Sequence, residues 1–191
     1  LNDGLLIDNF EFRTASPFID APAGRFFDVS IALPNSMDTV GALYKETFLL
    51  ESNMTYIVVA SGVIGSGMYD PATDFSLEVI AEAREMSMTS GNVDVLVWHG
   101  ATDAPTVDVV ETLVGAGTIV DDLSYGEYQG YLDLAPTAYR LDVRDETGST
   151  TVATYQVDLS GLEDLAISVI ASGFLNPAMN NNGEAFGLFA E

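Results

Sequence analysis

The chain has 191 residues, of which 29 are acidic and 6 are basic, and its formal net charge at pH 7 is −23. Such a surface repels phosphate groups, so the composition excludes nucleic-acid binding and a basic membrane contact. The chain has no cysteine, which excludes disulfides, thiolate catalysis and cysteine-bound zinc. Hydrophobic residues make up 48% of the chain, enough for a folded core, and no apolar run is long enough to span a membrane.

Four segments in the first half of the chain have the composition of β-strands. They are rich in β-branched and aromatic residues and are separated by turn-forming residues. Residues 77–88 have helical propensity because they are rich in Glu, Ala and Met. Their first part aligns with the end of the chain, however, and this favours a strand followed by a polar linker. The predicted strands cover residues 25–32, 42–50, 55–63 and 75–81.

The second half continues the same pattern of short apolar runs and turns. Amphipathic helical segments do not separate these runs, and this organisation is typical of an antiparallel β-sandwich. The turns are marked by clusters of Gly, Asn, Asp and Ser. The predicted strands cover residues 93–98, 107–111, 139–144, 152–158, 166–173 and 185–189.

The sequence also repeats itself. Residues 21–29 resemble residues 135–143, and residues 58–64 resemble residues 169–175, in the same order along the chain. Two copies of one module explain this pattern better than one large domain. We therefore predict an all-β protein made of two tandem immunoglobulin-like antiparallel β-sandwich domains.

The first copy is predicted to be incomplete. The residues that would correspond to 93–112 fall before Leu1, so we expect the first copy to start in mid-domain, without its first strands. The predicted domains are residues 1–87 and residues 93–191, joined by a linker at residues 88–92.

Three sequence blocks of the second copy resemble the domain of unknown function 4397 family. The first contains His99-x-x-x-Asp103-Ala104-Pro105 between two apolar runs, and the others cover residues 123–132 and 169–188. The resemblance implies tandem immunoglobulin-like sandwiches in large extracellular or surface-anchored bacterial proteins, with no established activity. The first copy lacks the histidine block, and its counterpart of Tyr125-Gly126 is predicted to be Glu11-Phe12.

His99, the only histidine, is the one obvious candidate for acid–base catalysis, with Asp103 as its partner. A turn joining two strands explains the same block, because Asp can bind nearby backbone amides and Pro105 fixes the exit. Ser61 and Ser172, each followed by glycine, are interpreted as strand-end residues. We therefore assign no catalytic residue and expect a protein that is not an enzyme.

Three oxygen-rich segments are candidates for calcium, at residues 70–74, 121–122 and 180–184. None has the spacing of an EF-hand, and Asn-Gly is also a common hairpin turn, so no metal ligand and no cofactor is assigned, with calcium left open. Tyr125, Tyr128 and Tyr131 could stack on sugars, but strand alternation separates Tyr128 from the other two.

Two functions follow from these observations. The first is a non-catalytic structural or adhesive protein, extracellular or at the cell surface, that associates with itself or with neighbouring repeats. A sandwich without its first strands exposes strand edges. If upstream residues of the same polypeptide supply the missing strands, the chain is a fragment of a longer repeat protein, and if another subunit supplies them, the chains are linked into a filament. The alternative is a carbohydrate- or calcium-binding module of a larger secreted protein, with a glycan or surface polymer as its partner.

Overall fold

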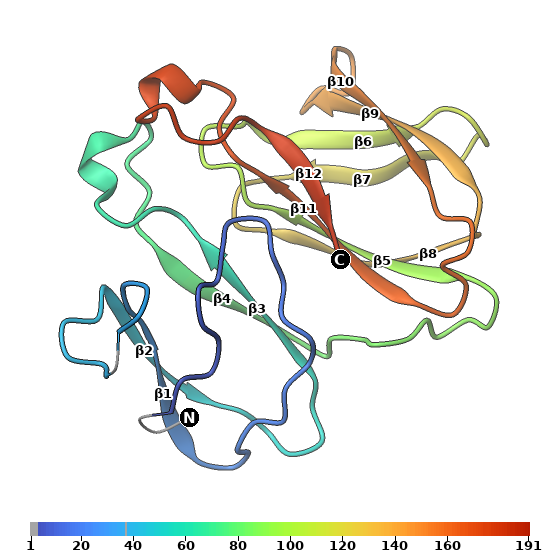
Figure 1. The fold of residues 1–191 in the computed structure, drawn as a ribbon. Coiled ribbons are helices and arrows are strands. Elements are labelled where there is room, and N and C mark those ends of the chain that lie inside the picture. Colours follow the sequence, from blue (N-terminus) through green and yellow to red (C-terminus); the bar gives the residue numbers. More distant parts are fainter. Residues whose placement is uncertain (1–3, 37) are drawn as a thin grey trace. The chain divides into compact units, whose positions relative to one another are not determined.

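The computed structural model describes residues 4–36 and 38–191. The described part is nearly all β-strand, with two short 3₁₀ turns, η1 (Ser66–Met68) and η2 (Pro177–Met179), as Figure 1 shows. No helix in these residues is long and apolar enough to cross a membrane. The predicted all-β fold is confirmed. The strands are β1 (Phe26–Ile31), β2 (Tyr44–Leu49), β3 (Tyr56–Ser61), β4 (Ser76–Ala81), β5 (Val93–His99), β6 (Val107–Glu111), β7 (Gly117–Leu123), β8 (Tyr128–Leu134), β9 (Ala138–Asp145), β10 (Thr151–Asp158), β11 (Ala166–Ser172) and β12 (Gly187–Ala190).

The strands fall into two compact units. Unit 1 consists of the chain up to Gly65 together with Asp74–Ala83. Unit 2 consists of Ser66–Thr73 together with Arg84–Glu191. The middle of the loop between β3 and β4, which includes η1, therefore belongs to unit 2.

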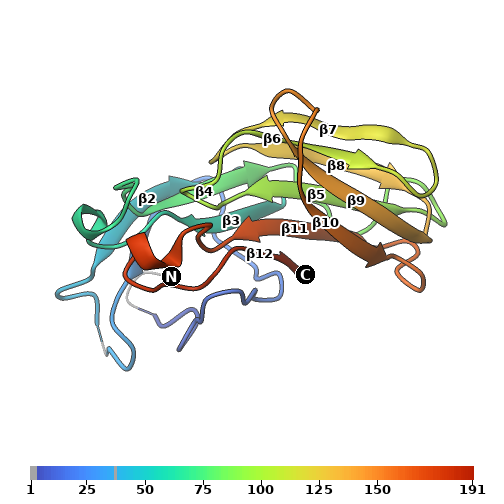
Figure 2. The same ribbon diagram turned by 90° about the horizontal axis from the view of Figure 1, so that it is seen from above.

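Unit 2 is a β-sandwich of two four-stranded sheets, in the orders β10-β9-β6-β7 and β12-β11-β5-β8 (Figures 1 and 2). Neighbouring strands are antiparallel except β5 and β11, which are parallel. This pair departs from the purely antiparallel arrangement predicted from the sequence. The chain passes through β9 and β10 in the other sheet before it returns as β11 beside β5. A hairpin connection between neighbouring strands would instead have made them antiparallel.

The core of unit 2 lies between its two sheets. Val93 and Val95 of β5 are buried together with Tyr139 and Leu159, and Val97 packs against this cluster. Alternate residues of a strand face opposite sides, so these valines line one face of β5. The Tyr139 hydroxyl donates a hydrogen bond of 2.8 Å to the carbonyl of Ala135. A tyrosine that bonds to the backbone a few residues upstream is a feature of immunoglobulin-like sandwiches.

Unit 1 contains two sheets of two strands each, β1-β2 and β3-β4. Phe27 and Phe48 lie side by side on the first sheet, with ring centroids 6.1 Å apart. Tyr44 of β2 meets Phe75, just before β4, edge to face at 4.9 Å. Aromatic side chains thus connect the two small sheets.

The strands of unit 1 correspond to the last four strands of unit 2. Thr47 donates a hydrogen bond of 2.6 Å to Asp28 across β1 and β2, and Thr154 donates one of 2.8 Å to Asp142 across β9 and β10. The sequence repeat likewise pairs β3 and β4 with β11 and β12, and η1 with η2. The two-copy organisation is therefore visible in the structure as well as in the sequence.

The sequence pattern missed β7 and β8. The pairing of β7 with β6 shifts register at two points, and the pairing of β8 with β5 shifts at one. These irregularities break the two-residue alternation from which strands are predicted. Asp121, Asp122 and Gly130, which have low strand propensity, weaken the signal further.

The segment that includes the predicted linker, residues 84–92, is attached to unit 2. Met86 forms an isolated antiparallel bridge with Leu165. The N–H of Ser87 donates a hydrogen bond of 2.9 Å to the carbonyl of Asp164. The N–H of Asp164 donates one of 2.8 Å to the carbonyl of Asn92. These contacts place the segment along the edge of the second sandwich.

Candidate functional site

His99 ends β5 and begins the turn that leads to β6. Its side chain is buried, and its Nε2 donates a hydrogen bond of 3.0 Å to the carbonyl of Pro105. Burial lowers the pKa of His99 and outweighs the opposite effect of the bond to Pro105. The imidazole is therefore neutral at pH 7, and the Tyr125 ring meets it edge-on at 6.5 Å.

Asp103 is turned toward another loop. Its Oδ1 accepts a hydrogen bond of 2.8 Å from the N–H of Leu175, and its Oδ2 accepts one of 2.8 Å from the N–H of Asn176. Asn180 Nδ2 adds a longer bond of 3.3 Å to Oδ2. Since His99 bonds to Pro105 and Asp103 bonds to the loop between β11 and β12, the two side chains form no proton relay.

Two of the three calcium candidates meet at Asn180, which is fully buried. Its Oδ1 accepts a hydrogen bond of 2.9 Å from the N–H of Asp70, and its Nδ2 donates one of 3.0 Å to the carbonyl of Asn176. The Tyr69 ring stacks on Phe174 nearby, with centroids 5.7 Å apart. The hydrogen bonds of the Asn180 side-chain amide thus hold the segment around Asp70 against η2.

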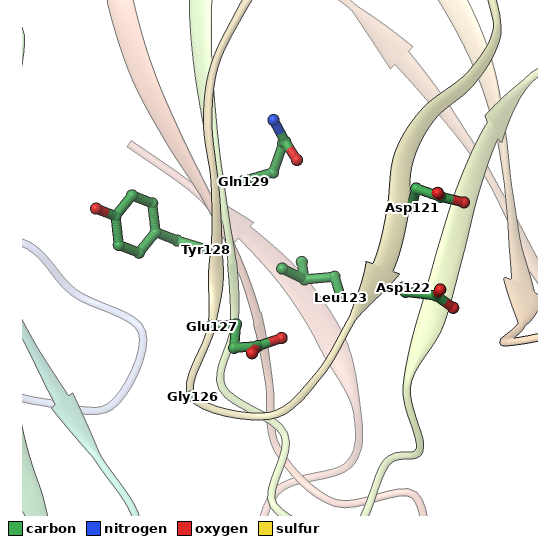
Figure 3. Close-up of a pocket in the computed structure, with 7 residues that line it drawn as sticks. All are labelled: Asp121, Asp122, Leu123, Gly126, Glu127, Tyr128 and Gln129. Carbon is green, nitrogen blue, oxygen red and sulfur yellow. The ribbon is translucent and has the colours of Figure 1, made fainter.

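The third calcium candidate borders a surface hollow at the turn between β7 and β8. Asp121, Asp122 and Glu127 are among its lining residues, and Figure 3 shows the side chains of the two aspartates directed away from Glu127. Glu127 also accepts a hydrogen bond of 3.0 Å from the N–H of Ser124. Within the described residues, no group of three or more His, Asp or Glu side chains is arranged to hold a metal ion.

The three candidate tyrosines do not form one platform. Tyr128 stacks on Trp98, with centroids 6.4 Å apart, and remains 47% exposed. The guanidinium carbon of Arg84 lies 4.6 Å from the centre of the Tyr131 ring, and the Tyr131 hydroxyl accepts a hydrogen bond from the backbone N–H of Arg84. Tyr125 lies in the turn against His99. Each ring therefore has a partner of its own.

Ser61 and Ser172 occupy the ends of equivalent strands and are buried. The glycines that follow them, Gly62 and Gly173, have φ of +71° and +78°. A Cβ at Gly173 would lie 2.4 Å from the carbonyl oxygen of Ala185, so a side chain cannot fit there. The Ser-Gly pairs mark close approaches between two chain segments.

Glu111 is a buried carboxylate that the sequence did not single out. It ends β6 and accepts hydrogen bonds from backbone N–H groups of the following turn, at 2.6 Å from Leu113, 2.8 Å from Gly115 and 3.1 Å from Ala116. Burial alone would raise the pKa of Glu111, but these N–H groups outweigh it and lower the pKa to about 2. The glycines of the turn were its only sequence signal.

Asp94 is the second buried acid missed from the sequence. It accepts hydrogen bonds of 2.6 Å from Arg84 Nη1, 3.1 Å from Ser87 Oγ and 3.1 Å from the N–H of Met88. Burial opposes ionisation of this carboxyl, but Arg84 and the other donors together lower its pKa. Asp94 therefore holds the segment that joins β4 to β5 and offers no open site.

Unit 1 differs from unit 2 in the exposure of its apolar residues. Val58 on β3 is 49% exposed, whereas its counterpart Val169 on β11 packs against the core of unit 2. Phe26 on β1 is also exposed. Further exposed apolar side chains precede β1, at Leu5, Leu6, Ile7, Phe10, Phe12, Phe18 and Ile19.

The family described as Domain of unknown function (DUF4397) matches the chain twice, at residues 1–110 and 93–181. The chain belongs to the DUF4397 family. No curated protein and no solved structure matches it. The two DUF4397 matches overlap at residues 93–110, which contain β5, the His99 turn and most of β6. This strand–turn–strand segment therefore lies within both matched ranges.

Proposed function

We propose that this DUF4397 chain is a non-catalytic structural or adhesive protein, extracellular or on the cell surface, that associates through strand addition. The observation that carries the proposal is the pair of two-stranded sheets in unit 1, where unit 2 has sheets of four strands. Sheets of two strands are marginal alone, and unpaired strand edges are templates for further strands.

Strand addition links molecules in one direction. The acceptor lies in unit 1, and a donor on a different surface of the next molecule makes a heterologous contact, which produces a filament when it does not close into a ring. The net charge of −23 supports a surface that remains solvated between such contacts. The resemblance to surface-anchored bacterial proteins motivates the proposed location.

Electron microscopy and light scattering of the purified chain test this proposal. We expect filaments or large assemblies whose growth is blocked by Val58→Asp, because this change places a charge on the exposed face of β3. Thr151→Asp is the matched control, because it places the same charge on an exposed position of β10 in unit 2. Thr47→Asp on β2 is unsuitable, because it would also break the hydrogen bond between Thr47 and Asp28. A monodisperse monomer in which β1 and β3 are both protected from hydrogen exchange would overturn the proposal.

The second candidate is a carbohydrate- or calcium-binding module, favoured by the surface hollow whose lining residues include Asp121, Glu127 and Tyr128. A glycan array with and without chelator tests it, together with the melting temperature in calcium. Binding that is lost in Tyr128→Ala would support this candidate. No glycan binding and no calcium-dependent shift would eliminate it.

A further inference from the structure

Unit 1 contains the counterpart of the turn between β7 and β8. Asn9 and Arg13 have φ of +50° and +57°, and Asp122 and Gly126, equally spaced, have φ of +49° and +81°. Left-handed φ is uncommon for residues other than glycine, so the shared pair identifies the same turn in both units.

This turn corrects the sequence alignment by one residue. It places Phe12 opposite Tyr125, whereas the sequence had paired Tyr125-Gly126 with Glu11-Phe12. The sequence itself favours the corrected register, because it aligns Asp8 with Asp121 and Phe12 with Tyr125, whereas the first register placed Glu11 opposite Tyr125. With it, Ile7 corresponds to Val120 and Phe10 to Leu123.

The segments on either side of the unit 1 turn do not form strands, although their counterparts are β7 and β8. In unit 2, β7 pairs with β6, and β8 pairs with β5. Of the strands of unit 2, only β5 and β6 have no sequence counterpart among the described residues of unit 1. Unit 1 therefore lacks one inner strand in each of its two sheets.

The exposed side chains agree with this deduction. Ile7 is 38% exposed and Phe10 is 53% exposed, whereas Val120 and Leu123 are 2% and 6% exposed. These positions belong to the core of a complete sandwich. In the described residues of unit 1, no strand covers them.

We propose that unit 1 is a receptor for a strand–turn–strand segment with the chemistry of residues 93–111. The first strand enters one sheet parallel to β3, and the second enters the other sheet antiparallel to β1. This inference rests on the proposed function and names the partner of that function. The donor is the equivalent segment of a neighbouring DUF4397 repeat.

Unit 2 identifies the chemistry of this donor. Beside β11 and β9, the counterparts of β3 and β1, the places that are open in unit 1 are filled by β5 and β6. A neighbouring repeat that begins as unit 2 does would present the two strands that unit 1 lacks. Within this chain, the segment at 93–111 is already used by unit 2.

Unit 2 also predicts the register of the added strands. Val97 pairs with Val169 of β11, and Val109 pairs with Val143 of β9. The counterparts of these acceptors in unit 1 are Val58 on β3 and Val29 on β1. The donor residues equivalent to Val97 and Val109 are thus expected beside Val58 and Val29.

The donor turn adds a polar contact. In unit 2, Asp103 accepts hydrogen bonds from the N–H groups of Leu175 and Asn176. The repeat places Ile64 and Gly65 at these positions in unit 1. The donor aspartate is therefore expected to bind the N–H groups of Ile64 and Gly65, which distinguishes specific insertion from general hydrophobic adhesion.

A synthetic peptide of residues 93–112 added to the full chain tests the receptor. We expect saturable binding with one peptide per chain, and slower hydrogen exchange in β1, β3 and the segment before β1. A peptide carrying Asp103→Ala is expected to bind about tenfold more weakly, because charge-assisted hydrogen bonds are lost. A scrambled peptide of the same composition is the control. Equal binding by all three peptides would overturn the proposal.

A cross-link tests the register, since the chain has no cysteine of its own. Val58→Cys is expected to form a disulfide with a peptide carrying Val97→Cys faster than with one carrying Leu96→Cys, because successive strand residues face opposite sides. Equal rates for the two peptides would contradict the predicted pairing.

A fusion avoids dependence on the behaviour of the free peptide. In this fusion, residues 93–113 are joined directly before Leu1. The added segment then precedes Asn9 by the same number of residues by which it precedes Asp122 in unit 2. We expect this fusion to raise the melting temperature of unit 1, whereas the same fusion with Val95→Asp and Val97→Asp should not. Equal melting of the two fusions would overturn the receptor.

The receptor and the filament can fail separately. Peptide binding to a chain that never assembles would support the receptor and contradict the filament. Filaments that form normally in the presence of saturating peptide, with no slowing of exchange in β1 or β3, would contradict the receptor while leaving self-association in place.

Discussion

Asp103 accepts a hydrogen bond of 2.8 Å from the backbone N–H of Asn176. Asp103 lies between β5 and β6, and Asn176 lies between β11 and β12, so the bond ties two distant loops together. The loops meet because β5 and β11 are parallel neighbours whose ends lie at the same side of the sheet. The aspartate of the His-x-x-x-Asp-Ala-Pro block thus holds these two loops together.

Asp103→Ala is expected to lower the free energy of unfolding of unit 2 by about 1–3 kcal/mol, because it leaves two N–H groups without their acceptors. The only tryptophan, Trp98, lies on β5 and reports on unit 2 during urea unfolding. Glu163→Gln, an exposed acid in a loop, is the matched control and should change the free energy by less than about 0.5 kcal/mol. Equal urea midpoints for the two variants would show that this clamp does not stabilise the unit.

His99 is expected to titrate below its ordinary pKa of 6.5, because burial disfavours the charged imidazole. The unfolded chain takes up this proton near pH 6.5 and the folded chain only at lower pH, so stability is lost as the pH falls below 6.5. NMR of the single imidazole gives the pKa directly. His99→Gln should show a weaker loss of stability over the same range, and a pKa at or above 6.5 would contradict the buried neutral state.

The internal repeat allowed much of the fold to be predicted from sequence. Asp28 and Asp142 align in the sequence, and in the structure each accepts a hydrogen bond from a threonine of the neighbouring strand. What sequence could not show was β7, because its bulged pairing with β6 removes the alternation of apolar residues. The parallel pairing of β5 with β11 was also missed, since it depends on how the chain crosses between sheets.

The candidate site was predicted less completely, for a physical reason. His99 and Asp103 stood out by residue type. The turn interpretation expected Asp103 to bind nearby backbone amides, whereas its carboxylate accepts hydrogen bonds from the distant N–H groups of Leu175 and Asn176. Glu111 did not stand out because its partners are backbone N–H groups, which nearly every residue type carries. The receptor in unit 1 rests partly on the φ of Asn9, which no sequence pattern specifies.

Gly173→Ala is expected to destabilise unit 2 severely, by about 2 kcal/mol or more, because the new Cβ would lie 2.4 Å from the Ala185 carbonyl oxygen at a φ of +78°. Gly130→Ala is the matched control, since nothing lies within 4 Å of its Cβ position. Thermal unfolding of both variants measures the difference. A Gly173→Ala protein as stable as Gly130→Ala would mean that the loop between β11 and β12 can move aside.

Glu111 should make unit 2 sensitive to acid. Its folded pKa is about 2, below its ordinary value of 4.5, so its contribution to stability is complete above pH 4.5 and is lost as the pH falls toward 2. Glu111→Gln removes the charge that binds the N–H groups of Leu113, Gly115 and Ala116 while keeping a similar shape. We expect this variant to be less stable than the natural chain at pH 7 and to lose less stability on acidification.

Urea unfolding at pH 7, 4.5 and about 2.5, followed by Trp98 fluorescence, measures this effect for both proteins. Asp145, whose pKa is also lowered to about 2, contributes equally to both, so the difference between them isolates Glu111. Convergence of the two stabilities at low pH is the expected result, because protonation removes from Glu111 the charge that the Glu111→Gln variant lacks at every pH. A constant difference from pH 7 to about pH 2.5 would instead mean that the N–H groups stabilise the turn without depending on the charge of Glu111.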